Sequence, residues 1–229
     1  MNWKDWDQHS AEEVIAGAIK QYGSRLAIAS SFGLEDMVLI DMASKIQSGV
    51  TVFTLDTGRL HEETYELMER TRNKYDINLQ VYFPDQAAVE TLVREKGFFS
   101  FRDSIDNRKE CCRIRKVEPL GRALSGLDAW VTGLRREQSV TRTDIAKAGE
   151  DADRPPMIKF NPLADWTEEQ VNVYLKDYQV PVNALHARNY PSIGCAPCTR
   201  AITEGEDVRA GRWWWENPEH KECGLHRPK

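Results

Sequence analysis

Short apolar runs of strand length alternate with longer amphipathic stretches along this chain, and this alternation constrains the fold more than any other feature. The strand-like runs cover residues 26–29, 50–55, 77–83 and 129–132, and the helix-like stretches cover 35–46, 61–74, 87–95 and 168–176. Strands and helices in alternation are typical of parallel sheets built from right-handed crossovers. The sequence therefore predicts an α/β fold, with a mostly parallel sheet and helices on both of its faces.

Two segments outside this alternation carry local signals. Ser10 and Glu13 form a capping-box pattern before an apolar-periodic stretch that stops at Gly23, so a first helix is expected there. Residues 144–156 are polar and end in Pro-Pro, which indicates a surface excursion rather than a domain boundary. We expect one nucleotide-binding and metal-binding domain over residues 1–203 and a flexible C-terminal segment over residues 204–229.

Length and charge exclude several classes of protein. A chain of 229 residues buries a core without disulfides. Its formal net charge of −5 argues against a protein that coats DNA, and no apolar run reaches the length of a bilayer span. The first residues are acidic where a signal peptide is basic and then apolar. We expect a cytoplasmic protein that binds neither nucleic acid nor membranes.

The five cysteines fall into two pairs and one single residue. Cys111 and Cys112 are adjacent, Cys195 and Cys198 form a CxxC motif, and Cys223 stands alone. Two thiolate pairs brought together by the fold form a four-sulfur site for zinc or for an iron–sulfur cluster. Adjacent cysteines strain the angles around a single zinc ion, whereas a cluster offers separate iron atoms. The competing interpretation is that Cys111 and Cys112 are small core residues.

Basic residues surround the first cysteine pair in a protein that is acidic overall. They are Arg108, Lys109, Arg113, Arg115 and Lys116. A run of charge is most often a solvated helix face. The alternative is an anion site beside the metal, where cations offset the thiolate charge and hold an anionic substrate.

Three loops follow predicted strands and contain small or basic residues. They cover residues 30–36, 55–59 and 133–138. Such loops at the carboxyl ends of parallel strands bind phosphate groups in α/β sheets, although each one alone is also compatible with a plain connection. None has the GxGxxG or Walker pattern, which disfavours dinucleotides and ordinary ATPases. Together the three loops favour a nucleotide pocket.

The C-terminal residues hold three consecutive tryptophans and the fifth cysteine. Trp213, Trp214 and Trp215 cannot all face one core, and a clamp on the protein surface accounts for some of them. Cys223 has Lys221, His226 and Arg227 nearby, and such cations favour the nucleophilic thiolate. An ordinary exposed cysteine is the competing interpretation.

The motifs CCRIRK, CAPCTR, GRWWWE and ECGLH, with LDTGRLH and SSFGLED upstream, closely resemble those of the assimilatory adenylyl-sulfate (APS) reductases of the phosphosulfate reductase family. The resemblance extends from about Leu26 to His226. It implies an adenine-nucleotide α-hydrolase-like sheet related to the PP-loop pyrophosphatases.

The resemblance also implies roles for individual residues. Cys111, Cys112, Cys195 and Cys198 would ligate a [4Fe-4S] cluster, and Cys223 would be the nucleophile. The implied substrate contacts are Ser30, Ser31, Gly33, Leu55, Gly58, Arg59, Lys116, Gly133, Arg135, Arg209, Arg212 and His226. Two positions depart from relatives: Arg108 stands where a histidine can occur, and Phe32 stands where some relatives carry a second serine.

The implied reaction is reduction of APS to sulfite and AMP through a Cys223 thiosulfonate, with thioredoxin as the electron donor, in sulfate assimilation. Reduction of 3′-phosphoadenylyl sulfate (PAPS), or of both substrates, is the nearest alternative. An ATP pyrophosphatase or tRNA-thiolating enzyme would share the fold, but the usual SGGxDS motif is missing. A metal-binding regulator without enzymatic activity would leave Cys223 and the nucleotide loops unused. The oligomeric state is left open, a homo-oligomer included.

Overall fold

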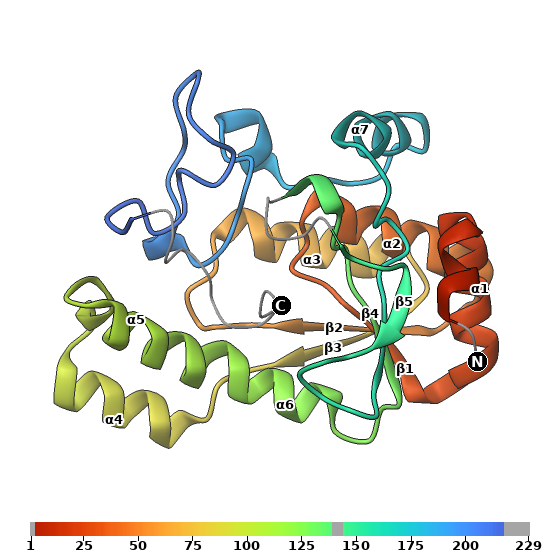
Figure 1. The fold of residues 1–229 in the computed structure, drawn as a ribbon. Helices are drawn as coiled ribbons and strands as arrows, with labels where there is room; N and C mark the ends of the chain where they lie inside the picture. The colour runs from red at the N-terminus through yellow and green to blue at the C-terminus, as the bar shows by residue number, and fades with distance from the viewer. Residues whose placement is uncertain (1–2, 139–143, 218–229) are drawn as a thin grey trace.

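The computed structural model describes residues 3–138 and 144–217 and shows a six-stranded sheet in the order β3-β2-β1-β4-β6-β5 (Figure 1). All neighbouring strands are parallel except β5 and β6, which are antiparallel. The strands are β1 (Leu26–Ala29), β2 (Val50–Leu55), β3 (Ile77–Tyr82), β4 (Ala129–Val131), β5 (Ala148–Glu150) and β6 (Ile158–Phe160). The helices are α1 (Ala11–Tyr22), α2 (Leu34–Ile46), α3 (Glu62–Lys74), α4 (Gln86–Lys96), α5 (Ile105–Cys112), α6 (Glu118–Leu124) and α7 (Glu168–Asp177). The predicted fold class is confirmed.

Helices cover both faces of the sheet, with α1, α2, α3 and α7 on one face and α4, α5 and α6 on the other (Figure 1). The strands alternate accordingly: Leu26 and Ile28 of β1 join the larger core, whereas Ala27 joins the smaller core around α6. In β4, Val131 belongs to the larger core and Trp130 to the smaller one. This period of two is what a sheet buried on both faces requires.

Local signals set the helix boundaries. At α1 the Ser10 side chain accepts a hydrogen bond from the Glu13 N–H, and the Glu13 carboxylate accepts one from the Ser10 N–H, so the predicted capping box is confirmed. Thr167 and Gln170 form a second capping box at α7. Among the described residues, no helix is long and apolar enough to cross a membrane.

The sheet has its topological switch point between β1 and β4. From β1 the chain continues through β2 to β3 on one side, and β4 then returns to the other side of β1, where Leu26 pairs with Ala129. Ligands of open α/β sheets bind at such a point, outside the carboxyl ends of the strands. The loops that follow β1 and β4 therefore lie where a nucleotide is expected.

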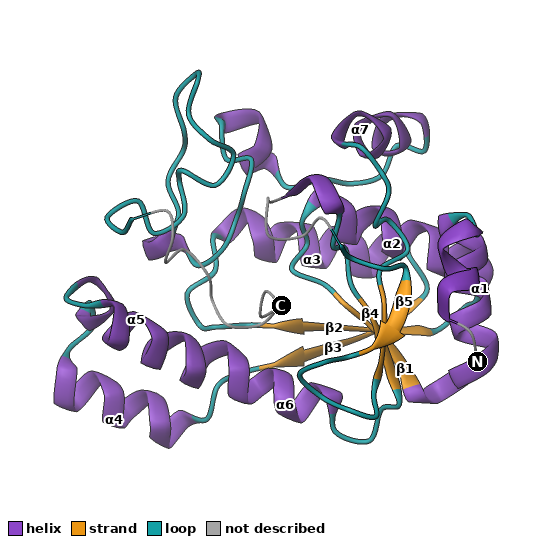
Figure 2. Cartoon of the chain, viewed as in Figure 1, coloured by secondary structure: helices purple, strands orange, loops and turns teal. Residues whose placement is uncertain are grey.

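Several elements were not predicted from the sequence. α5 and α6 are joined without a break by a π-helical segment, Arg113–Val117, in a stretch whose charges hide any apolar period. The polar excursion at residues 144–156 contains β5, which forms an antiparallel edge strand. Beyond α7 the described chain consists of loops and short 3-10 turns, as Figure 2 shows.

Candidate functional site

A cavity of about 440 Å³ opens at the carboxyl ends of β1, β2 and β4. Its size is that of a small-ligand pocket. Most of the predicted substrate contacts line it: Ser30, Ser31, Gly33, Leu55, Lys116, Gly133, Arg135, Arg209 and Arg212. The three loops that the sequence singled out thus meet at one pocket, which we call the nucleotide pocket.

Two predicted contacts lie elsewhere. Arg59 lines a second cavity, described below, and its guanidinium donates to the Phe98 carbonyl oxygen over 2.8 Å. Gly58 has φ +69°, and a side chain there would meet Arg115 at 3.5 Å. These two residues therefore shape the loop after β2 without lining the nucleotide pocket.

The loop after β1 is held by a buried carboxylate at the start of α2. Asp36 accepts hydrogen bonds from the Ser31 N–H over 2.6 Å and from the Ser31 hydroxyl over 2.8 Å. Burial raises the pKa of Asp36 to about 6, although both bonds from Ser31 favour the charged form. Phe32 stands in the left-handed region, with φ +60°, and its ring is buried. The residue that departs from some relatives is therefore a core residue here.

The loop after β4 packs directly on the same turn. A Cβ at Gly133 would lie 2.6 Å from Asp36 Oδ1 and 2.9 Å from Glu35 Cβ, so only glycine fits. Arg135 donates from Nε to Glu35 over 2.8 Å, with 7% of its side chain exposed. Its charge is therefore already partnered by a carboxylate at the pocket wall.

Arg212 enters the pocket from the C-terminal loops. Its Nη1 lies 3.3 Å from both the Ser192 hydroxyl and the Ile193 carbonyl oxygen, and the residue is 8% exposed. A Cβ at Gly194 would overlap the guanidinium, so this glycine lets Arg212 pass. Ser192, Ile193 and Gly194 were missed by the sequence analysis. Their position directly before the CxxC motif is a signal that could have identified them.

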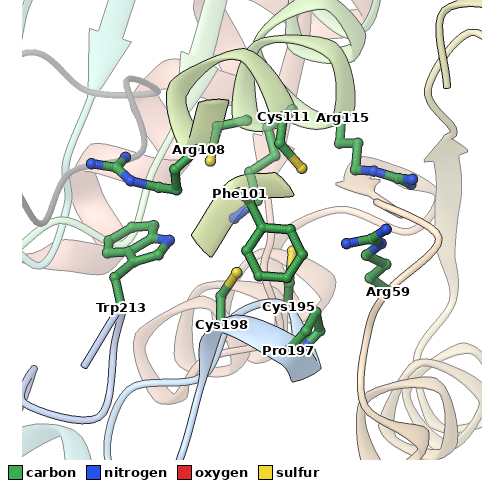
Figure 3. A pocket seen from close by; sticks show the side chains of 11 residues that line it. Arg59, Phe101, Arg108, Cys111, Arg115, Cys195, Pro197, Cys198 and Trp213 are labelled. Atoms are coloured by element: carbon green, nitrogen blue, oxygen red, sulfur yellow. The ribbon is translucent and has the colours of Figure 1, made fainter. Parts of the chain in front are cut away.

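The second cavity is lined by all four paired cysteines, and we call it the cysteine cavity. Cys111 and Cys112 end α5, while Cys195 and Cys198 lie on the loop after α7 and approach from the other side (Figure 3). None of the four forms a disulfide. All four paired cysteines therefore line one cavity, and their role as cluster ligands stays a prediction.

The charges around this cavity differ from one sulfur to another. Burial raises the pKa of the Cys195 thiol, but Lys116, the hydrogen bond with Thr57 over 3.2 Å and nearby arginines outweigh burial and lower it overall. Burial and the neighbouring Cys195 raise the pKa of Cys198 to about 12. Burial likewise raises the pKa of Cys111. Of Cys111, Cys195 and Cys198, only Cys195 therefore has its thiolate favoured by the nearby cations.

The donor set of the cysteine cavity is of the kind that holds an iron–sulfur cluster. Within residues 3–138 and 144–217, no three His, Cys, Asp or Glu side chains are close enough to hold one metal ion. Four thiols nevertheless line one cavity, and thiolates on separate irons do not need to converge on one point. The residues present therefore fit an iron–sulfur cluster.

Some basic residues near the first cysteine pair are solvated, and others are buried or line a cavity. Lys109 and Arg113 are exposed, as on a solvated helix face. Arg115 is buried and donates to the Thr57 carbonyl oxygen over 2.6 Å. Arg108 is also buried, in an ion pair with Glu216. Lys116 lines both cavities.

Part of the C-terminal segment packs on the domain, up to Glu216, which pairs with Arg108. Trp213 is 1% exposed and lines both cavities, whereas Trp214 is exposed. The prediction that the three tryptophans do not share one core is confirmed. Cys223 and His226 lie outside the described residues, so the nucleophile, the His226 contact and the flexibility of residues 204–229 remain predictions.

Residues 25–201 match the family model described as "Phosphoadenosine phosphosulfate reductase domain". The chain belongs to this family. Two curated members named adenosine 5′-phosphosulfate reductase, from Allochromatium vinosum and Burkholderia cepacia, are 51% and 50% identical to it. The alignments cover 95% and 93% of this chain and 84% and 85% of those relatives. Membership confirms the expectation of an enzyme that acts on a sulfur group.

Solved structures confirm the fold. A family member, the phosphoadenylyl-sulfate (PAPS) reductase of Candida auris in a phosphate complex, has a TM-score of 0.72 and 28% identity over 85% of this chain and 91% of that one. The FMN adenylyltransferase of Candida glabrata has a TM-score of 0.56 at 12% identity, over 96% of this chain and 80% of that one. The second likeness shows the sheet architecture alone.

Proposed function

We propose that this enzyme reduces APS to sulfite and AMP, with thioredoxin as the electron donor and a thiosulfonate on Cys223 as the intermediate, in sulfate assimilation. The observation that carries the proposal is the position of Lys116, which lines both the nucleotide pocket and the cysteine cavity. A phosphosulfate group beside Lys116 would lie next to the four-cysteine site. An ordinary nucleotide-binding protein has no need for that adjacency.

The nucleotide pocket supports an adenylyl anion as substrate. Its wall near the C-terminal loops carries Lys116, Arg209 and Arg212, which would neutralise the phosphosulfate. The loop after β1 lies at the N-terminus of α2, where backbone N–H groups favour negative charge. We assign the phosphosulfate to the cationic wall and the nucleoside to the remainder of the pocket.

In this proposal Cys111, Cys112, Cys195 and Cys198 hold a [4Fe-4S] cluster. When bound, the cluster would supply fixed charge and cross-links between two distant segments of the chain. The cations near Cys195 then have two tasks, because they stabilise the thiolates and attract the anionic substrate. The expected readout is iron and acid-labile sulfide in anaerobically purified protein, both lost in Cys195→Ser. One zinc per chain would contradict this assignment.

The reaction proceeds in two transfers. The Cys223 thiolate attacks the sulfur of APS, the sulfur–oxygen bond to the phosphate breaks, and AMP leaves with the electron pair. Lys116, Arg209 and Arg212 would stabilise the charge that develops on that oxygen. A thioredoxin thiolate then attacks Cys223 Sγ, and sulfite leaves with the electron pair of the broken sulfur–sulfur bond. The second thioredoxin thiol releases Cys223, so the dithiol becomes a disulfide and two protons are lost.

PAPS reduction is the second candidate. It is favoured by the structural likeness to the Candida auris PAPS reductase, at 28% identity. The curated relatives named for adenosine 5′-phosphosulfate are much more similar, at 51% and 50% identity, and therefore favour APS.

The test is turnover of APS and PAPS, in parallel, by anaerobically purified protein with reduced thioredoxin. We expect sulfite and AMP from APS at the higher catalytic efficiency. Preferential use of PAPS would replace the proposed substrate, and absence of sulfite from both would refute the proposed function.

A further inference from the structure

A group of exposed aromatic residues lies beside the cysteine cavity, next to its lining residues Phe101 and Pro197. This aromatic patch consists of Phe98, Phe99, Arg102 and Trp214, and its three aromatic residues are 66%, 60% and 39% exposed. Burying each such ring in a complex removes a large apolar area from water. Single exposed apolar residues are ordinary, but a contiguous group of them marks an interaction site.

Arg102 connects Phe99 with Trp214, and Phe98 is the sequence neighbour of Phe99. The Arg102 guanidinium lies 5.3 Å from the Phe99 ring centroid and 5.8 Å from that of Trp214. It also lies 5.7 Å from the Phe101 ring, which lines the cysteine cavity from inside. Residues from two distant segments of the chain therefore form one surface around a single cation.

The patch is also tied to the CxxC loop. Arg102 Nη2 lies 3.4 Å from the carbonyl oxygen of Pro197, between the two cysteines of that motif. Arg59, which donates to the Phe98 carbonyl oxygen, adds a second cation beside the patch. A partner would therefore meet an apolar surface with a positive edge.

The aromatic patch is close in sequence to Cys223, and this indicates what kind of protein binds there. The described chain ends at Asn217, three residues after Trp214, and Cys223 follows six residues later. Six residues of extended chain span at most about 20 Å. A protein docked on the patch would therefore lie within reach of the Cys223 sulfur.

We infer that the aromatic patch is the docking site for the electron-donor protein, a small dithiol protein with an apolar surface around its thiols and acidic groups opposite Arg102 and Arg59. This inference rests on the proposed function, because a docking site for a dithiol protein is useful only if a thiosulfonate on Cys223 has to be reduced. Aromatic residues and arginine are the residue types that contribute most to protein–protein affinity.

Two variants test the inference. Phe98→Ser and Phe99→Ser each alter an exposed residue outside the nucleotide pocket. We expect each to raise the KM for reduced thioredoxin at least tenfold. The rate of sulfite release with dithiothreitol, and the formation of the Cys223 adduct without any reductant, should stay as in the wild type.

Two control variants remove apolar side chains elsewhere. Phe83→Ser changes a 55% exposed ring before the start of α4, and Val173→Ser changes a 51% exposed residue on α7, across the sheet. Both should leave the KM for thioredoxin unchanged. An equal rise in the control and patch variants would overturn the inference.

Three other outcomes would show that the electron-donor protein does not bind the patch or that the proposed function is wrong. If the patch variants also lose turnover with dithiothreitol, the patch serves the chain's own segments and the inference is wrong. If the wild type sediments as a dimer and the patch variants as monomers, with unchanged KM, the occupant is a second copy. If the wild type releases no sulfite with either reductant, the proposed function itself fails, independently of the patch.

Discussion

Arg108 and Glu216 form a buried, two-point ion pair between the helix of the first cysteine pair and the C-terminal segment. Arg108 Nε and Nη2 donate to the two carboxylate oxygens of Glu216 over 2.8 and 2.9 Å, with side chains 1% and 5% exposed. The guanidinium also lies 4.8 Å from the Trp213 ring centroid. Glu216 therefore holds the C-terminal segment against α5, seven residues before Cys223.

Removing the carboxylate should destabilise the protein strongly. Glu216→Ala removes the carboxylate that pairs with the buried Arg108 charge, and breaking such a pair typically costs about 3–5 kcal/mol. The measurement is the free energy of unfolding in denaturant. The matched control is Glu118→Ala, which removes the partner of Arg122 at the same 2.8 Å separation but on the exposed surface. That change should cost less than about 1 kcal/mol, and equal losses would contradict the account.

Gly133 should be required for nucleotide binding. In Gly133→Ala the added Cβ would overlap Asp36 and Glu35, so the loop after β4 must move away from α2. We expect at least tenfold weaker AMP binding by calorimetry. Gly121→Ala places its Cβ in open space and is the control. Unchanged affinity in Gly133→Ala would mean that these loops do not hold the nucleotide.

Arg212 and Arg209 should contribute to catalysis. Arg212→Ala and Arg209→Ala each remove a cation from the pocket wall, and losing a charged hydrogen-bond partner costs about 1.5–3 kcal/mol. This corresponds to a loss of kcat/KM of roughly ten- to 150-fold. Arg188→Ala removes an exposed arginine that pairs with Glu63 and should leave kcat/KM unchanged. Wild-type efficiency in both pocket variants would mean that these arginines do not contact the substrate.

Stability should depend on pH through Asp36. Burial raises the pKa of this carboxyl to about 6, whereas that of an aspartate in an unfolded chain is about 3.9. Between these values the folded state holds more protons, so the free energy of unfolding falls as pH rises from about 4 to 6 and levels off above. Asp36→Asn removes this fall, and its stability relative to the wild type should rise by on the order of 3 kcal/mol across that range. The measurement is denaturant unfolding at several pH values, and a constant difference would contradict the assignment.

The sequence predicted the elements that have a clear apolar period. The strands at residues 26–29 and 50–55 match β1 and β2, because a strand buried on both faces is rich in apolar residues. α5 and β5 escaped prediction for the opposite reason. Arg108 of α5 is buried through an ion pair with a distant residue, which its local sequence does not indicate. The three residues of β5 form a strand because they pair with β6.

For the candidate site, the sequence indicated which residues matter but not which side chains they contact. Cys111 and Cys195 stood out because thiols in pairs are rare, and the structure brings them to one cavity. Nothing local indicated that Arg108 pairs with Glu216, 108 residues away, or that Arg135 pairs with Glu35. Such pairings depend on the final fold, so charge alone could not divide the arginines between substrate contact and structural support.

The central claim is that Cys223 receives the sulfite group, and mass spectrometry of the intact protein tests it most directly. Wild-type protein incubated with APS and no reductant should gain one sulfite-sized mass, located on the peptide with Cys223. Reduced thioredoxin should then remove that mass and release an equal amount of sulfite. Cys223→Ser should keep its iron and bind APS but gain no mass, because a hydroxyl is a far weaker nucleophile at neutral pH. An adduct on any other cysteine, or sulfite release by Cys223→Ser, would contradict the account.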